Sequence, residues 1–299
     1  MNCFSCNQNI VSDGIPYGYA HQNIGFSQIF PNLKITLCTQ CEIAQINHKL
    51  IDQEKLNHYY FYCYRENRLD GDNGTEYCRK YFTARGRSQA RLIKKYLGKK
   101  KVARVFEYGA GYGYNLLEIS KLFPKADLYT NEIDKTIEKL MEFKKYKPDL
   151  QYDIILMSHV LEHLLNPQEI IQSMVNCLAP GGLLFIEIPN EQAKVLRAVE
   201  KIEPHITFFN LNSLKNFIKK YSNNKLEIVY SGTAGLTQAN NYNQIKINLL
   251  FRVINSLHYR TRRCVKWILN GGHHTPEFNF SNDTNEDIWN TIRVVCRKV

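Results

Sequence analysis

The stretch 101–113 constrains the fold of this chain more than any other feature. Its sequence, Lys-Val-Ala-Arg-Val-Phe-Glu-Tyr-Gly-Ala-Gly-Tyr-Gly, is typical of a strand that runs directly into a glycine-rich turn. Each of Gly109, Gly111 and Gly113 removes a Cβ at a point where the backbone must bend sharply or approach a ligand closely. Taken alone, this turn is as compatible with a purely structural role as with a binding site. The segments that follow it in the sequence decide between these two roles.

The spacing of the glycines excludes two phosphate-binding loops. A dinucleotide-binding turn has the pattern G-x-G-x-x-G, in which the third glycine lets the helix begin close to the pyrophosphate. Tyr114 occupies that third position here. No Gly-Lys-Ser/Thr follows the turn, which excludes a P-loop. What remains is a turn of three alternating glycines with Glu107 two residues ahead of it.

Strands and helices alternate after this turn. Helical patterns cover 115–123, 135–147, 168–178, 191–202 and 211–221, and strand patterns cover 102–108, 126–130, 152–157, 183–188, 226–230 and 288–296. Only a short space around 148–150 remains for a third strand. The alternation predicts an α/β protein with a doubly wound, mostly parallel, seven-stranded sheet and helices on both faces. In such sheets, ligands lie beyond the carboxyl ends of the strands.

Several polar residues are expected at that edge of the sheet. Glu132 lies nineteen residues beyond Gly113, close to the roughly twenty expected of an acidic residue that accepts both ribose hydroxyls of a bound nucleoside. A solvated carboxylate is the alternative interpretation of Glu132, and the spacing favours the binding role. Ser158 and His159 follow the strand at 152–157. We therefore predict that Glu107, the three glycines, Glu132, Ser158 and His159 bind a cofactor.

The sequence His159-Val-Leu-Glu162-His163 allows two interpretations. H-x-x-E-H is the pattern of inverted zinc proteases, which carry it on one continuous helix. Here it directly follows a buried-type strand and precedes Pro167, so we expect these side chains to line a cleft instead. A divalent metal held by Glu162 and His163 remains an alternative. His205, in a loop that returns to the ligand edge, is either a catalytic residue or a packing residue.

Two Cys-x-x-Cys pairs lie at the N-terminus. Cys3 and Cys6 form the first pair, and Cys38 and Cys41 form the second after thirty-one intervening residues. Two thiolates three residues apart on a tight turn can bind one ion, and two such turns complete the tetrahedral set of a structural zinc site. Unrelated free cysteines are the alternative. We predict a zinc-ribbon-like module that draws its stability from the metal.

Composition limits the setting and the partners. The chain has 299 residues, nine cysteines and a formal net charge of +11. It has neither an apolar run of about eighteen residues nor the opening of a secretory signal, so we expect a cytoplasmic, reducing location. The positive charge favours an anionic small molecule, nucleic acid or an anionic membrane face, or it is a solvated surface.

Three parts are expected along the chain. They are the zinc-binding module at 1–45, a helical linker at 46–100 that contributes to the substrate site, and the α/β domain at 101–299. The helix at 79–101, rich in arginine and lysine, could hold a nucleotide diphosphate. An insertion at 231–285 has a basic helical centre, 245–269, which is interpreted as a lid, an interface helix or a helix on an anionic membrane.

Three segments together resemble class I S-adenosylmethionine-dependent methyltransferases. They are Glu-x-Gly-x-Gly-x-Gly at 107–113, Val-Leu-Glu-His-Leu at 160–164 and Leu-Ala-Pro-Gly-Gly-Leu-Leu-Phe-Ile-Glu-Ile-Pro-Asn at 178–190. The resemblance covers the chain from residue 102 to its end. It implies the Rossmann-like methyltransferase fold, S-adenosylmethionine as cofactor and a transferase activity. An RNA methyltransferase with a zinc module for RNA binding and a non-catalytic scaffold of the same fold are the alternatives.

The cysteine pairs make the layout similar to that of zinc-containing methyltransferases that modify carbon atoms of nucleotide-linked sugars. That similarity implies a histidine in a Tyr-x-Glu-His context that takes a proton, assisted by a second histidine. By motif these positions are His205 and His163. Ile202 and Pro204 occupy the tyrosine and glutamate positions, which puts the sugar reaction in doubt and leaves methyl transfer unaffected.

Overall fold

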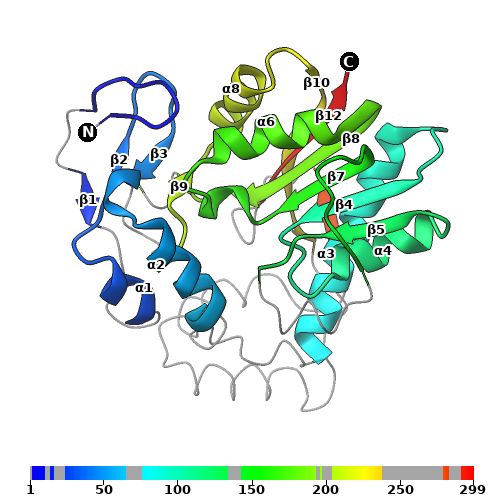
Figure 1. Cartoon of the computed structure of the whole chain (residues 1–299), viewed down its shortest axis with the longest axis horizontal. Helices are drawn as coiled ribbons and strands as arrows, with labels where there is room; N and C mark the ends of the chain where they lie inside the picture. The colour runs from blue at the N-terminus through cyan, green and yellow to red at the C-terminus, as the bar shows by residue number, and fades with distance from the viewer. Residues whose placement is uncertain are drawn as a thin grey trace, which may run out of the picture.

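The computed structural model describes residues 2–10, 14–16, 24–64, 76–133, 143–192, 196, 204–237, 279–282 and 291–299 (Figure 1). In chain order its elements are β1 (Ile15–Pro16), α1 (Ile24–Ile29), β2 (Lys34–Leu37), β3 (Ala44–Ile46), η1 (His48–Leu50), α2 (Gln53–His58), η2 (Tyr59–Cys63), α3 (Glu76–Leu97), β4 (Arg104–Tyr108), α4 (Tyr114–Leu122), β5 (Asp127–Thr130), β6 (Lys144–Lys145), β7 (Tyr152–Ser158), η3 (Leu161–His163), α6 (Pro167–Cys177), β8 (Leu178–Pro189), β9 (Thr207–Phe208), α8 (Leu211–Tyr221), β10 (Leu226–Thr237), β11 (Asn279–Asn282) and β12 (Thr291–Lys298).

The larger sheet has the strand order β11-β10-β12-β8-β7-β4-β5-β6. Strands β6, β5, β4, β7 and β8 are parallel to their neighbours, whereas β12, β10 and β11 are antiparallel. The described sheet has eight strands, one more than the seven predicted, because β11 pairs with the far end of β10. The parallel part follows the doubly wound order 3-2-1-4-5, whose direction reverses between β4 and β7.

Apolar strand residues point alternately to two separate cores, as parallel strands covered on both faces require. One core joins Phe106, Ile155 and Leu184 to α6 and α8. The other joins their sequence neighbours Val105, Ile154 and Leu183 to α3 and α4. Figure 1 shows α6 running beside β8, with α8 next to α6. The sheet is therefore a middle layer between two helical layers.

Local sequence signals fix the ends of the helices on this sheet. Asn210 and Ser213 form a reciprocal capping box at the start of α8, and Pro167 occupies the first turn of α6. Leu214 and Phe217 lie at helical spacing on the buried face of α8. Each such side chain stabilises the fold by about 1.5–3 kcal/mol when it is fully removed from water.

Two predicted boundaries were wrong because tertiary contacts override local patterns. The lysine-rich helix was expected to continue to residue 147, but residues 144–145 form β6 beside β5. There Tyr146 donates its N–H to the carbonyl of Thr130, and its ring stacks on Phe106 at 4.4 Å. Strand β8 begins at Leu178, before the predicted 183, and carries a register irregularity against β7 near Tyr152.

The N-terminal elements form a second sheet with the order β1-β2-β3-β9. Its last strand comes from residues 207–208, directly after His205, and pairs with β3. Figure 1 places this sheet to the left of the larger one, with β9 between them. After β3, the beginning of the predicted helical linker consists of η1, α2 and the π-helix η2. Tyr59 and Leu56 of these helices are buried beneath α1.

Some predictions lie outside the described residues. These are most of the helix at 191–202 and the whole helical centre of the insertion, 245–269. The described ends of the stretch 231–285 are strands, because β10 continues to Thr237 and β11 covers Asn279–Asn282. Among the residues that the structure describes, no helix combines the length and apolarity needed to cross a bilayer.

Candidate functional site

The glycine turn after β4 has the backbone that only glycine adopts easily. Gly109, Gly111 and Gly113 have φ angles of +65°, +54° and +72°. A Cβ on Gly109 would lie 2.9 Å from a methyl carbon of Val160, so the turn packs tightly against the segment after β7. A Cβ on Gly111 would meet no atom of the described residues within 4 Å. The turn is thus closed on one side and open at Gly111.

The two residues that directly follow strand β5 hold this turn. Asn131 Oδ1 accepts a hydrogen bond from the N–H of Gly109 at 3.1 Å, and Glu132 Oε2 accepts one from the N–H of Gly111 at 2.6 Å. Strands β4 and β5 are parallel neighbours, with Glu107 opposite Thr130, so their ends meet at one edge of the sheet. Glu132, which was predicted from its distance to Gly113 in the sequence, therefore lies against the glycine turn.

A cavity of about 610 Å³ opens at this edge, a size typical of small-molecule sites. Of the nine residues predicted to bind the cofactor or to act in catalysis, eight line it: Glu107, Gly109, Gly111, Glu132, Ser158, His159, His163 and His205. Gly113 does not line the cavity and instead begins helix α4. Residues that are far apart in sequence thus meet around one space.

Glu107 is fully buried beneath the glycine turn. Its Oε1 accepts a hydrogen bond of 2.6 Å from Asn115 Nδ2 on α4, while its Oε2 has no hydrogen-bond partner among the described residues. Burial raises the pKa of Glu107 to about 8, against the opposing effect of the Asn115 amide. A buried acceptor without a donor is costly, so Oε2 marks a position where a ligand donor would stabilise the site.

A buried ion network supports the wall of the cavity, and the sequence analysis missed it. Glu187 on β8 lies 2.5 Å from Arg293 Nε on β12, 3.4 Å from Arg85 Nε on α3 and 3.2 Å from His159 Nε2. Burial acts to raise the pKa of Glu187, but Arg293, His159 and Arg85 outweigh it and hold that pKa below its usual range. No sequence motif links these residues, because the sheet brings them together.

His159 has an unusual backbone that this network stabilises. Its φ is +56°, which is uncommon for a residue other than glycine, and its N–H donates to the carbonyl of Glu187 at 2.8 Å. Burial and nearby Arg85 lower the pKa of His159 to about 4. Ser158 beside it is almost fully buried and accepts a hydrogen bond from Gln89 on α3. His159 also precedes helix η3, so no continuous helix carries the H-x-x-E-H pattern.

The predicted catalytic histidines lie together at another part of the cavity wall. The rings of His163 and His205 meet edge to face, with centroids 4.6 Å apart. His163 Nδ1 lies 2.9 Å from the hydroxyl of Tyr60, and His205 Nδ1 lies 2.8 Å from Glu191 Oε2. The neighbouring Glu162 is buried, which raises its pKa to about 7. Tyr60 and Glu191 were not predicted, because no spacing rule connects them to the histidines.

Aromatic side chains line much of the remaining wall. Phe82 stacks on Tyr114 at 5.8 Å, and Tyr60 meets Tyr64 edge to face at 5.2 Å. All four rings line the cavity. Arg85 is the only Lys or Arg among the described residues of this wall, and it already pairs with Glu187. The described surface of the cavity is therefore aromatic rather than cationic.

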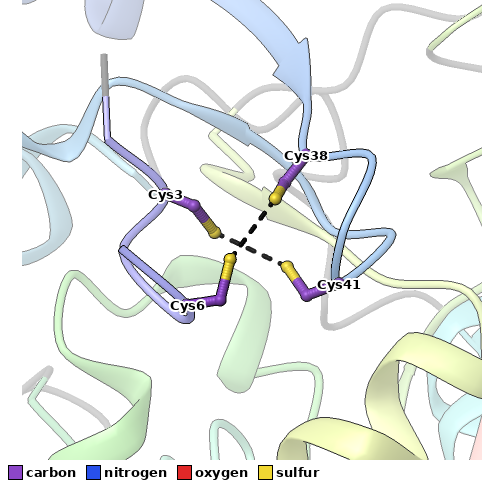
Figure 2. Close-up of side chains that lie close together, drawn as sticks. All are labelled: Cys3, Cys6, Cys38 and Cys41. Atoms are coloured by element: carbon purple, nitrogen blue, oxygen red, sulfur yellow. Dashed lines mark hydrogen bonds between the residues drawn. The ribbon is translucent and has the colours of Figure 1, made fainter. Parts of the chain in front are cut away.

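The four N-terminal cysteines converge on one point, as Figure 2 shows. The sulfur atoms of Cys3 and Cys41 are 3.5 Å apart, as are those of Cys6 and Cys38. Tetrahedral zinc with Zn–S bonds of about 2.3 Å requires sulfur separations of roughly 3.8 Å. The arrangement thus fits a zinc site with four cysteine ligands.

The two knuckles also share one backbone conformation. In the first, the N–H of Asn7 donates to the carbonyl of Cys3, and in the second the N–H of Glu42 donates to the carbonyl of Cys38. Both Asn7 and Glu42 have a positive φ. Tyr221 on α8 donates to the carbonyl of Ser5, which attaches the first knuckle to the larger sheet's helices.

The strand order defines a doubly wound fold, and the glycine turn and the acidic residue that follows β5 lie at its switch point, where such folds bind ligands. Residues 81–223 match a family model described as a methyltransferase domain. Residues 81–223 are therefore similar to a methyltransferase domain, which is the class that the sequence motifs predicted.

Short stretches are also similar to curated proteins. The ubiquinone biosynthesis O-methyltransferase of Glaesserella parasuis serovar 5 is 42% identical over 59 residues, which cover 20% of this chain and 25% of that protein. The protein of the same description from Escherichia fergusonii is 26% identical over 87 residues, or 29% and 35%. The chain thus aligns with about a quarter to a third of the length of these relatives.

Solved structures give weaker similarities. The plantazolicin methyltransferase BpumL in complex with SAH has a TM-score of 0.48 at 13% identity, covering 82% of this chain and 94% of that one. A possible histamine N-methyltransferase from Thermotoga maritima has a TM-score of 0.45 at 13% identity, covering 76% and 97%. The class of the domain accordingly rests on the family match and on the geometry of the sheet edge.

Proposed function

We propose that this protein transfers the methyl group of S-adenosylmethionine to a small acceptor. The observation that carries the proposal is Glu132, which lies at the end of β5 against the open side of the glycine turn within a methyltransferase domain. In this role Glu132 accepts hydrogen bonds from the two ribose hydroxyls. Ser158 and His159, predicted to bind the cofactor, are further around the same cavity.

The residues present fit such a cofactor. Gly111 leaves room for a ligand next to the backbone, and Glu107 Oε2 is a buried acceptor to which no described residue donates. The cofactor's ammonium group would supply the missing donor to Glu107. When bound, S-adenosylmethionine supplies an electrophilic methyl carbon on a positively charged sulfur. The protein then has to orient the acceptor and take up its proton, and positioning provides much of the rate enhancement.

His205 and His163 are proposed to act on the acceptor's proton. Glu191 and Tyr60 fix the Nδ1 side of the two rings, so each ring presents its Nε2 side for chemistry. A neutral imidazole in this position can draw the proton from an attacking hydroxyl or carbon acid. Such a residue typically accelerates a reaction by about 10²–10⁴-fold.

Two classes of acceptor are proposed for this site. The first is a nucleotide-linked sugar or glycan precursor, methylated on oxygen or carbon, which agrees with the paired cysteine knuckles and the net charge of +11. The second is a phenolic acceptor methylated on oxygen. The ring-lined wall formed by Tyr60, Tyr64, Phe82 and Tyr114 favours this second class, as does the limited similarity to ubiquinone biosynthesis O-methyltransferases.

The cysteine cluster is proposed to hold structural zinc. Four thiolates complete a closed tetrahedral site with no open position for catalysis. Because β3 of this module pairs with β9, which follows His205, the zinc site stabilises the loop that carries a proposed catalytic residue. The metal would thus contribute to the shape of the cavity without taking part in the reaction.

Calorimetric titration with S-adenosylmethionine tests the first step, and one binding equivalent is expected. Methyl-labelled cofactor should then be incubated with nucleotide sugars in one panel and with phenols and catechols in another. Transfer to either panel selects the acceptor class. The absence of cofactor binding to folded, zinc-loaded protein would overturn the proposed activity.

A further inference from the structure

Three side chains in the cavity wall form a cluster that the proton-transfer role does not fully explain. Glu162, His163 and His205 each offer one ligand atom, and these atoms all lie within 4.8 Å of one another. Glu162 is 2% exposed, and neither of its carboxylate oxygens accepts a hydrogen bond from a described residue, although His159 Nδ1 lies 3.5 Å from Oε1. A buried carboxylate in this condition is costly unless a cation compensates it.

The outer contacts of the two histidines orient both rings toward this carboxylate. The Tyr60 hydroxyl has the Pro204 carbonyl 3.4 Å away as its acceptor, so it is available to receive the Nδ1–H of His163 at 2.9 Å. Glu191 Oε2 receives the Nδ1–H of His205 at 2.8 Å. Both rings then present a lone pair on Nε2, and His163 Nε2 lies 3.9 Å from Glu162 Oε1.

This arrangement has the outer contacts of a metal site. Histidines that bind metals almost always donate their other ring N–H to a carboxylate, a carbonyl or another acceptor, which fixes the tautomer. Here Glu191 and Tyr60 provide those two acceptors. Two imidazoles and one carboxylate are also the protein ligand set of catalytic zinc and non-haem iron sites, which leave positions open for substrate.

We propose that Glu162, His163 and His205 bind one divalent cation in the wall of this cavity, with open positions that take an oxygen of the acceptor. The inference deepens the proposed function and rests on it for its catalytic meaning. In this arrangement the two imidazoles act as metal ligands in place of general bases, and the cation promotes loss of the acceptor's proton because it lowers the pKa of a bound hydroxyl. The cysteine cluster would hold a separate, structural ion.

The group transfer balances without any further reactant. The hydroxyl gives its proton to solvent, and its oxygen forms a bond to the methyl carbon. The carbon–sulfur bond breaks at the same time, its electron pair stays on sulfur, and the positive charge on sulfur is lost. An acceptor with two neighbouring oxygens, such as a vicinal diol or a catechol, is the chemical class that would occupy two open positions of the cation.

Manganese binding to the zinc-loaded full chain tests the site without requiring turnover. Mn²⁺ suits imidazole and carboxylate ligands and binds poorly to thiolates, so electron paramagnetic resonance reports this cluster rather than the cysteines. One Mn²⁺ should bind to the wild type, and Glu162→Gln should weaken its affinity at least tenfold. The matched control is Glu169→Gln, an exposed glutamate on the same cavity wall, which should bind as the wild type does.

Zinc stoichiometry by mass spectrometry covers the case in which the cluster prefers zinc. The wild type should hold a second zinc equivalent that Glu162→Gln loses and Cys38→Ser retains. Absence of both the Mn²⁺ signal and the second zinc equivalent, or equal binding by Glu162→Gln, would overturn the proposal. Circular dichroism and cofactor titration of each variant show whether it is folded. Metal binding without cofactor binding would defeat the proposed methyl transfer while leaving the metal site in place.

Discussion

Replacement of Glu132 by glutamine isolates its predicted contact with the cofactor. Glu132 Oε2 accepts the Gly111 N–H at 2.6 Å, so Glu132→Ala would also disturb the glycine turn. Glutamine has the same shape and keeps an oxygen that can accept this bond. It loses the negative charge, and its amide nitrogen cannot accept a bond from a ribose hydroxyl. The variant therefore separates the ligand contact from support of the turn.

The expected loss follows from one charged hydrogen bond. A hydrogen bond to a charged group contributes about 1.5–3 kcal/mol, and about 1.4 kcal/mol corresponds to a tenfold change in Kd. Glu132→Gln should therefore raise the Kd for S-adenosylmethionine by about tenfold to about 150-fold in calorimetric titration. Glu132→Ala should raise it further. Glu169→Gln, which changes an exposed carboxylate on the same cavity wall, should leave it unchanged.

Two outcomes would contradict the assignment of Glu132 as the ribose acceptor. Unchanged affinity in a Glu132→Gln protein that melts at the wild-type temperature would remove Glu132 as the ribose acceptor. Equal weakening by Glu132→Gln and Glu169→Gln would show a general effect of charge in the cavity instead of a specific contact.

Four further predictions follow from the structure. Cys38→Ser should lose the structural zinc and melt at a lower temperature, since zinc contributes roughly 10–16 kcal/mol of binding free energy in small modules. The control variant Cys63→Ser should keep the metal. Arg293→Met should lower the free energy of unfolding in urea by about 3–5 kcal/mol because it strips a buried partner from Glu187, and wild-type stability would contradict that role. In the cofactor-free folded protein the pKa of Glu107 is about 8, whereas in the unfolded chain it is about 4.5. The folded state therefore binds more protons between these values, and the free energy of unfolding should fall as the pH rises from about 4.5 to about 8. Glu107→Gln should remove this fall. His205→Ala should bind cofactor normally and lose at least about 10²-fold in turnover, and full activity would reduce His205 to a packing residue.

Local sequence was sufficient for features that depend on short-range backbone geometry. Three alternating glycines require a backbone with positive φ, and the turn at 109–113 has it. The paired Cys-x-x-Cys spacing placed four thiols in two similar knuckles whose sulfurs meet. The interval between Gly113 and Glu132 reflected one helix and one strand, whose lengths are set by local patterns. These features could be predicted because each depends on residues close in sequence or on a regular repeat.

The sequence did not predict interactions whose partners meet only through the sheet. Arg293 lies 106 residues beyond Glu187, yet the pairing of β12 with β8 places their side chains 2.5 Å apart. Strand β6 formed where a helix was expected because Tyr146 stacks on Phe106. Such contacts depend on the register of whole strands, which a local pattern does not contain.

By itself, therefore, the sequence determined the alternation of strands and helices, the glycine turn and the identity of eight residues that line the cavity. Only the tertiary structure decided that Tyr60 and Glu191 orient His163 and His205 toward the buried carboxylate of Glu162. The physical reason is that backbone conformation is set largely by neighbours in the chain. The protonation and ligand capacity of a side chain are set by burial and by donors that arrive from distant segments.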